Sequence, residues 1–196
     1  MAQIGLKNIH VAKILEETKE ETLYDTPRKI AHAITANVTP NVETAVLHGD
    51  DRAVESTDEL ADIDIEIGIT DLSPEDYAYL LGKKVDANGG VVDSINDVAP
   101  ELALLFEVPL SKNGKRMYVY YKGKFSLPSS EHTTKQGSVE YQTPTLSGKF
   151  LPREDGVWRY RLDAAPTNKA IIDAWFTEVQ ESPEAEAVTP GETTTP

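Results

Sequence analysis

Residues 60–70 read Leu-Ala-Asp-Ile-Asp-Ile-Glu-Ile-Gly-Ile-Thr, and this stretch decides the class of fold. Isoleucine occupies every second position from Ile63 to Ile69, and acidic residues or glycine stand between. Successive side chains of a β-strand point to opposite faces, whereas a helix would distribute both kinds around its surface. The stretch therefore predicts a strand with one apolar and one acidic face.

The same two-residue period extends over most of the chain before residue 180. Alternating segments, and segments rich in β-branched and aromatic residues, predict further strands at residues 4–15, 30–38, 101–108, 116–125, 138–142, 145–150 and 157–162. Glycine-containing turns at residues 86–90, 112–114 and 155–156 favour hairpin connections. The sequence thus predicts a mainly β fold with largely antiparallel strands.

Two helices are expected among the strands. Ser73 as N-cap, Pro74 in the first turn and Gly82 as a stop signal predict a short helix over residues 74–81. Near the C-terminus, Thr167 is expected to cap a flanking helix over residues 168–179. Its apolar stripe would dock on the sheet and consists of Ile171, Ile172, Trp175, Phe176 and Val179.

The composition excludes several classes of protein. The chain has 196 residues, 19 basic and 33 acidic side chains, a formal net charge of −14 and no cysteine. Disulfide frameworks and cysteine-bound metal centres are therefore excluded. The negative charge argues against a protein that binds nucleic acid or an anionic membrane tightly. No apolar run approaches the ~20 residues of a membrane span, and the N-terminus lacks the apolar core of a signal peptide.

The last sixteen residues differ from the rest of the chain. Residues 181–196 read ESPEAEAVTPGETTTP, with three prolines, four glutamates and no basic residue. Such a segment buries too little apolar surface to offset the entropy of ordering it. We expect a β domain over residues 1–180 and an acidic, disordered Pro/Thr/Glu-rich tail over residues 181–196.

Familiar catalytic and binding motifs are missing. Gly-Lys occurs four times, but no copy carries the following serine or threonine of a phosphate-binding loop. Neither a nucleophile elbow nor a dinucleotide-binding fingerprint is present. The four histidines, His10, His32, His48 and His132, lack the spacing of metal ligands. We therefore expect no catalytic, cofactor-binding or metal-binding residues.

Three acidic residues of the isoleucine strand are the first candidate functional residues. Alternation places Asp62, Asp64 and Glu66 on one face. A row of carboxylates without a companion histidine or a second acidic strand is most often a solvated face. There are two alternatives. The row is a charged wall that faces something functional, or it is a metal-binding or catalytic site.

A charge-rich segment immediately before that strand is the second candidate. Residues 50–59 are interpreted as a loop, which is either solvated or an assembly arm that orders on a neighbouring molecule. Its charged residues are Asp50, Asp51, Arg52, Glu55, Asp58 and Glu59.

Six segments, in this order along the chain, carry a resemblance to a known family. They are IGLKNIH (4–10), ITANVTPN (34–41), residues 60–72 with the following helix, DVAP (97–100), YKGKF (121–125) and VEYQTPTLSG (139–148). From about residue 4 to residue 179, the chain resembles the major tail proteins, or tail-tube proteins, of long-tailed phages that infect Gram-positive bacteria.

The resemblance implies a β-sandwich or β-barrel subunit with a flanking helix. Such subunits form hexameric rings that stack into the tail tube through which double-stranded DNA leaves the capsid. It implies no enzymatic activity, no cofactor and no membrane partner. It implies assembly in the host cytoplasm into a virion, together with tail terminator, tape measure and baseplate proteins.

The two candidate sets fit this role as hypotheses. Asp62, Asp64 and Glu66 would face the bore, where an acidic wall would repel the passing DNA. The charged segment at residues 50–59 and the N-terminal residues would contact the next ring. The alternative is an acidic β-sandwich module on a particle surface that recognises carbohydrate or protein.

Overall fold

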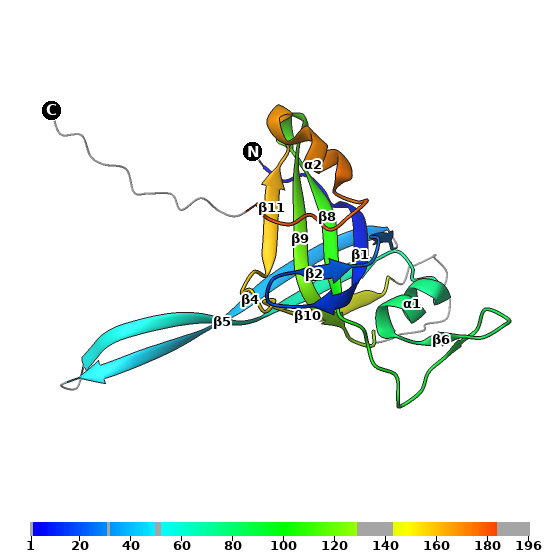
Figure 1. The fold of residues 1–196 in the computed structure, drawn as a ribbon, viewed down its shortest axis with the longest axis horizontal. Coiled ribbons are helices and arrows are strands. Elements are labelled where there is room, and N and C mark those ends of the chain that lie inside the picture. The colour runs from blue at the N-terminus through cyan, green and yellow to red at the C-terminus, as the bar shows by residue number, and fades with distance from the viewer. Residues whose placement is uncertain (1, 31, 50–51, 129–142, 184–196) are drawn as a thin grey trace, which may run out of the picture.

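The computed structural model describes residues 2–30, 32–49, 52–128 and 143–183, and its architecture is mainly β (Figure 1). The strands in chain order are β1 (Lys7–Glu17), β2 (Thr22–Tyr24), β3 (Arg28–Lys29), β4 (Ala33–Gly49), β5 (Arg52–Ile69), β6 (Lys84–Val85), β7 (Val91–Val92), β8 (Leu102–Leu110), β9 (Gly114–Phe125), β10 (Thr145–Leu151) and β11 (Arg159–Asp163). The two helices are α1 (Pro74–Leu81) and α2 (Lys169–Ala174), and no helix among the described residues has the length and apolar character needed to cross a membrane.

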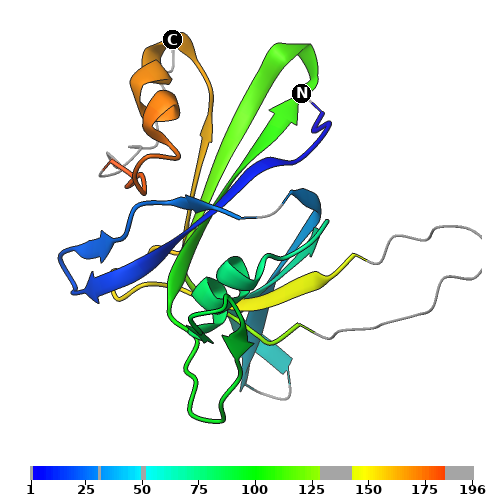
Figure 2. The ribbon, with the colours of Figure 1, turned by 90° about the vertical axis from the view of Figure 1, so that its right-hand side faces the viewer.

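All strand pairs in the main sheet are antiparallel, and their order is β2-β1-β8-β9-β10-β5-β4. The sheet bends at β9, which changes its pairing partner along its length. Its first half pairs with β11, and its second half, from Lys122 to Phe125, pairs with β10 instead (Figure 2). The strands beyond β10 therefore lie in a second layer over the main core, which confirms the predicted antiparallel β-sandwich.

The central strands β8 and β9 are buried on both faces. Alternate residues such as Leu104 and Tyr120 belong to the main core, together with the isoleucines of β5. The intervening residues, such as Leu105 and Tyr121, form a second cluster with Trp175. Burial on both faces explains why β8 reads as a continuous apolar run rather than as an alternating pattern.

The isoleucine strand is confirmed as part of β5. Ile63, Ile65, Ile67 and Ile69 are each 0% exposed, and the residues between them lie on the opposite face. The turn at residues 112–114 is also confirmed. Lys112 and Asn113 both have positive φ, at 65° and 60°, which lets Leu110 pair directly with Gly114.

Helix α1 has the predicted bounds and caps. The Ser73 hydroxyl accepts a hydrogen bond from the Asp76 amide at 3.1 Å, and Gly82 ends the helix in the left-handed conformation with φ 66°. The predicted hairpin around residues 86–90 is present as β6 and β7. The strand predicted at residues 138–142 lies outside the described residues.

The C-terminal helix is shorter than predicted. Pro166–Asn168 form a 3-10 turn that includes Thr167, so Thr167 does not cap the helix, which begins at Lys169. It ends at Ala174, whose carbonyl accepts a hydrogen bond from the Thr177 hydroxyl at 2.8 Å. The apolar stripe still docks on the sheet, with Ile172 and Trp175 buried in the second core cluster.

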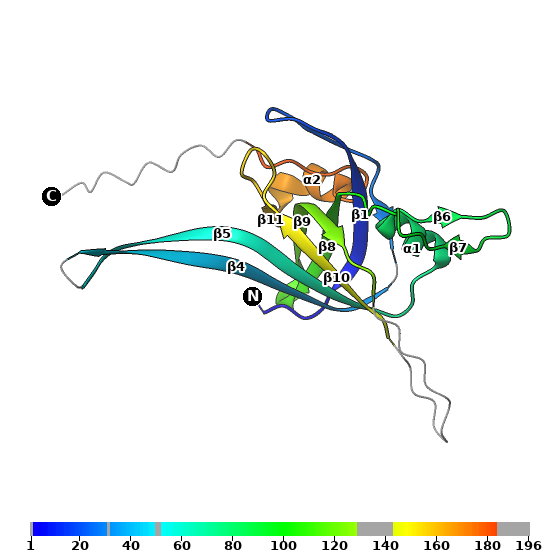
Figure 3. The ribbon, with the colours of Figure 1, turned by 90° about the horizontal axis from the view of Figure 1, so that it is seen from below.

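The interpretation of residues 50–59 as a loop is wrong for residues 52–59, which belong to β5, and residues 50 and 51 lie outside the described residues. Strand β4 continues to Gly49, and β5 begins at Arg52, so the two strands pair along one long antiparallel hairpin (Figure 3). Ala61 and Val54 have no partner in the register, which marks β-bulges that break the two-residue period. Pro40 is tolerated inside β4 because β4 is the last strand of the sheet.

Candidate functional site

The three acidic residues of the first candidate set share the solvent-facing side of the strands β10, β5 and β4, here called the outer face. The register places Asp62 opposite Asn41, and Asp64 opposite both Thr39 and Lys149. Glu66 is exposed, and the two aspartates are half-buried. The predicted row of carboxylates on one face is therefore present.

The aspartates of this row have partners that the sequence analysis missed. The Lys149 ammonium lies 2.8 Å from an Asp62 oxygen and 3.2 Å from an Asp64 oxygen. The Asn41 amide donates to both carboxylates, at 2.6 Å and 2.7 Å. Lys149 first and Asn41 second hold the pKa of Asp62 below its ordinary value, and the two aspartates raise the pKa of Lys149.

A second lysine further reduces the negative charge of the outer face. Lys124 of β9 pairs in register with Lys149, and its ammonium lies 3.3 Å from a Glu101 oxygen. The outer face therefore alternates carboxylates, amides, hydroxyls and tethered lysines. The alternation of apolar and polar residues in β10 indicates that Lys149 lies on the polar face of the strand. Its position opposite Asp64 depends on the β5–β10 register, which the sequence pattern does not give.

Four residues of the second candidate set, Arg52, Glu55, Asp58 and Glu59, lie on a hairpin arm that projects from the body of the molecule (Figures 1 and 3), and Asp50 and Asp51 lie outside the described residues. The arm consists of residues 42–49 of β4 and 52–60 of β5. Four large apolar side chains are 44–65% exposed on it, namely Val42, Val46, Leu47 and Val54. A two-stranded ribbon with no core of its own is marginally stable, so this surface is suited to contact another molecule.

The charges on the arm are poorly balanced within the subunit. Glu43 stands directly opposite Glu59, and Glu55 stands opposite Leu47 on the same face. Like charges directly opposite each other destabilise a ladder. Among the described residues, no ion pair joins these glutamates to a cation.

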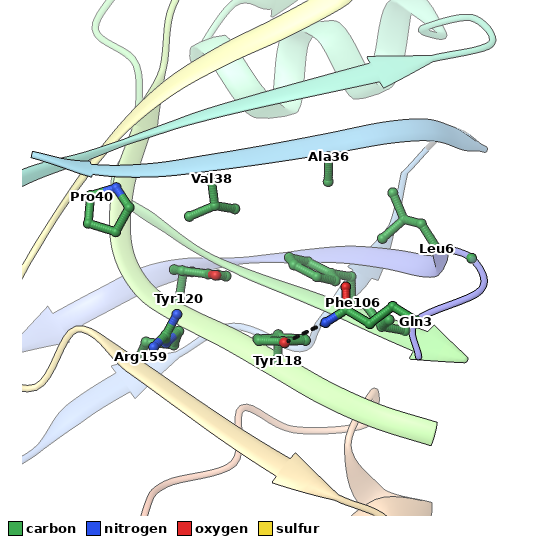
Figure 4. Close-up of a pocket in the computed structure, with 11 residues that line it drawn as sticks. Gln3, Leu6, Ala36, Val38, Pro40, Phe106, Tyr118, Tyr120 and Arg159 are labelled. Carbon is green, nitrogen blue, oxygen red and sulfur yellow. Dashed lines mark hydrogen bonds between the residues drawn. The ribbon is translucent and has the colours of Figure 1, made fainter. Parts of the chain in front are cut away.

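A cavity of about 280 Å³ opens between β4 and the strands β8, β9 and β11 (Figure 4). Its floor is a row of stacked rings, with the Phe106 and Tyr118 centroids 5.1 Å apart and the Phe106 and Tyr120 centroids 5.9 Å apart. Val38 and Pro40 face this row from β4, and Arg159 lies at one end of it. This aromatic floor with an arginine at its end is here called the ring groove.

Metal-binding and histidine chemistry receive no support from the arrangement. In the part of the chain that the structure describes, no group of three or more His, Cys, Asp or Glu could hold a metal ion. The His10 ring stacks on Phe176 with centroids 4.4 Å apart, and burial lowers the pKa of His10. His10 therefore packs the C-terminal segment against β1. His132 lies outside the described residues.

The sequence was compared with known protein families and with curated proteins. The family model described as phage tail tube protein matches residues 1–161, which spans β1 to the first part of β11. No curated protein matches the sequence. The matched region contains the outer face, the arm and the ring groove.

Proposed function

This chain belongs to the phage tail tube protein family, and on that premise we propose that it forms stacked hexameric rings whose bore conducts double-stranded DNA during genome ejection. As a member of this family, the chain is a structural protein of the virion tail. The ring, the stack and the DNA passage are the finer steps that we propose. Each is supported below by a different part of the subunit.

Ring closure is supported by the free edge of the sheet. Strand β4, with 17 residues, ends the strand order, and among the described residues its one partner strand is β5. A long edge strand invites pairing with another chain, and a closed ring satisfies every such edge. Pairing of the β4 edge with a neighbouring subunit would extend the outer face around the bore.

The DNA-facing wall is supported by the polar character of the outer face. We assign Asp62, Asp64 and Glu66 to the lumen. Glu66 repels phosphate, and the two aspartates hold the Lys149 ammonium at 2.8 Å and 3.2 Å, so this cation is already neutralised. A wall without free cations releases few counterions from DNA and therefore does not retain it.

Stacking of rings is supported by the arm. We assign the charged residues Asp50, Asp51, Arg52, Glu55, Asp58 and Glu59 to the contact between rings, together with the N-terminal residues. A protruding arm that meets a different surface of its neighbour makes a heterologous contact, and such contacts repeat along an axis. Two bulges set the twist of the arm.

The remaining parts of the proposal follow from the tail as an assembly. We propose tail terminator, tape measure and baseplate proteins as partners, assembly in the host cytoplasm, and no enzymatic activity. None of these roles needs a bound cofactor.

Electron microscopy of the purified full chain tests the proposal. We expect six-subunit rings and hollow tubes, which appear above a critical protein concentration. A protein that stays monomeric at every concentration overturns the proposal, and a monomer that binds a glycan or a protein ligand would favour the alternative of a surface recognition module.

A further inference from the structure

We propose that Glu101 prevents two lysines of the outer face, Lys124 and Lys149, from binding phosphate groups. The two ammonium groups form a latent phosphate site, and the Glu101 carboxylate reduces its positive charge. The inference deepens the proposed function and rests on it for the source of the phosphate, which is DNA in the bore. The charge compensation itself is a property of one subunit, so it can be tested without a tube.

The lysine pair has the geometry of a phosphate site. Lys124 of β9 and Lys149 of β10 stand directly opposite each other, and their side chains are 52% and 56% exposed. Residues opposite each other in an antiparallel ladder have Cβ atoms about 5 Å apart. Two long, exposed side chains at that spacing can converge on one phosphate group, which each ammonium binds through a charge-assisted hydrogen bond.

A cavity beside the pair adds neutral hydrogen-bond donors. It has a volume of about 320 Å³ and lies on the outer face, over β4, β5 and β10. Its lining includes the Lys149 side chain, three hydroxyl groups and two carboxylates, which belong to Thr39, Ser126, Ser147, Asp64 and Glu66. Hydroxyl groups donate to phosphate oxygens, whereas the carboxylates oppose an anion. Phosphate binding therefore depends on the balance of charges around the lysine pair.

The backbone places Glu101 beside Lys124. The Glu101 carbonyl accepts a hydrogen bond from the Ile14 amide at 2.9 Å, which ties the start of β8 to β1. The next residue, Leu102, pairs in register with Gly123, so Glu101 stands next to Lys124 at the end of the β8–β9 ladder. Because the Ile14 contact uses the carbonyl, a change of the Glu101 side chain leaves it in place.

The Glu101 carboxylate lies between two lysines of β9. One oxygen lies 3.3 Å from the Lys124 ammonium, and the other lies 3.9 Å from the Lys122 ammonium. Lys122 has a second carboxylate partner in Glu17. In the described part of the chain, Glu101 is the one carboxylate that forms an ion pair with Lys124. Loss of Glu101 therefore releases Lys124 rather than Lys122.

The charges of the outer face form a row across four strands. The order is Glu101 at the start of β8, Lys124 on β9, Lys149 on β10 and Asp64 on β5. The two lysines in the middle are each compensated from the far side, since the Lys149 ammonium lies 3.2 Å from an Asp64 oxygen. The row is neutral with Glu101 and carries one net positive charge without it.

Binding of inorganic tripolyphosphate tests the compensation in the full-length protein, below the concentration at which tubes form. Glu101→Gln should bind tripolyphosphate about fivefold more tightly than the wild type at low salt, because a unit charge about 4 Å away changes an equilibrium by that factor even in water. Added salt should reduce the difference. Glu20→Gln makes the same change of charge at the exposed turn after β1, and it should leave the Kd unchanged in isothermal titration calorimetry.

A second substitution identifies the released cation. Glu101→Gln combined with Lys124→Met should return the Kd for tripolyphosphate to the wild-type value. Glu101→Gln combined with Lys84→Met, at the exposed strand β6, is the matched control and should keep the tighter binding. Thermal unfolding of each variant shows that the subunit folds. If Glu101 only stabilised the fold, its substitution would lower the unfolding midpoint and leave the Kd unchanged.

Assembled tubes connect the result to DNA. Glu101→Gln tubes should retain linear duplex DNA at low salt in a sedimentation assay, and wild-type tubes should not, because each new phosphate contact makes retention depend on salt. An unchanged Kd for tripolyphosphate in Glu101→Gln, or tighter binding that persists with Lys124→Met, overturns the role of Glu101. Tighter tripolyphosphate binding without DNA retention by the tubes instead overturns the assignment of the outer face to the bore, and the compensation by Glu101 stands.

Discussion

The guanidinium of Arg153 binds the carboxylate of Glu181 through two nitrogen–oxygen contacts, at 2.7 Å and 2.9 Å. Arg153 is 8% exposed, and its guanidinium carbon lies 4.1 Å from the centre of the Tyr121 ring. The Tyr121 hydroxyl in turn donates to the Gln180 carbonyl at 2.9 Å. The start of the expected tail, residue 181, is thus anchored to the body, and residues 184–196 lie outside the described residues.

Removal of the Glu181 carboxylate should weaken this anchor. Asp155 still binds Arg153, and the Glu181 side chain is 50% exposed, so the expected loss for Glu181→Ala is about 1 kcal/mol of unfolding free energy. Urea denaturation measures it. Glu16→Ala, an exposed glutamate at the end of β1, is the control and should change little. Equal values for the two variants would mean that the anchor adds no stability.

Release of Lys149 from its two carboxylates should make the tube retain DNA. The variant with Asp62→Asn and Asp64→Asn removes both partners and leaves one free ammonium per subunit at the proposed wall. Each phosphate contact adds about −0.9 to the slope of log affinity against log salt. We expect salt-sensitive binding of linear duplex DNA to assembled tubes.

The control for this experiment adds Lys149→Met to the two asparagine substitutions. This triple variant has no ammonium at the site, and it should bind no more DNA than the wild-type tube. DNA binding by the triple variant as strong as by the double variant would contradict the tethering of Lys149.

Asp97 should contribute to stability only above acidic pH. The Ser94 amide, which donates at 2.6 Å, and then the Lys83 ammonium hold the pKa of Asp97 below its ordinary value. A lowered folded-state pKa means that the contribution is present above the unfolded value of about 3.9 and is lost as the pH falls through the folded value. The stability of the wild type should therefore fall as the pH is lowered below about 4. Asp97→Asn should be less stable at pH 7 and show a flatter profile below pH 4; an unchanged slope would exclude this role.

Gly123 should tolerate no larger residue while Phe150 is present. A Cβ atom at Gly123 would lie 2.3 Å from Cγ of Phe150, which is itself 1% exposed. Gly123→Ala should cost about 1–3 kcal/mol of unfolding free energy, measured with urea. Gly5→Ala is the control, since its Cβ would meet nothing closer than 3.8 Å. Combining Gly123→Ala with Phe150→Ala, which removes the clashing Cγ and Cδ atoms, should cost less than the sum of the two single substitutions, and strict additivity would show that the clash is relieved elsewhere.

The sequence predicted the features that depend on a local pattern of residues. It did not predict the contacts that join segments distant in the chain. The alternation in β5 and the caps of α1 predicted both elements correctly. The partner of Asp62 was missed because Lys149 lies 87 residues away and reaches it only through the β5–β10 register. The arm was missed because Pro40 and the bulges at Val54 and Ala61 interrupt the two-residue period.

A shortened arm should separate folding from assembly. The register pairs Thr44 with Asp58 and Leu47 with Glu55, so deletion of residues 44–47 together with residues 55–58 removes matched lengths of both strands and keeps residues 48–54. The deleted side chains make no contribution to either core cluster, so the thermal unfolding midpoint should stay within a few degrees of the wild type. Because the shortened arm cannot reach a neighbouring ring, electron microscopy should show rings at most, and tubes of normal length would refute a role of the arm in stacking.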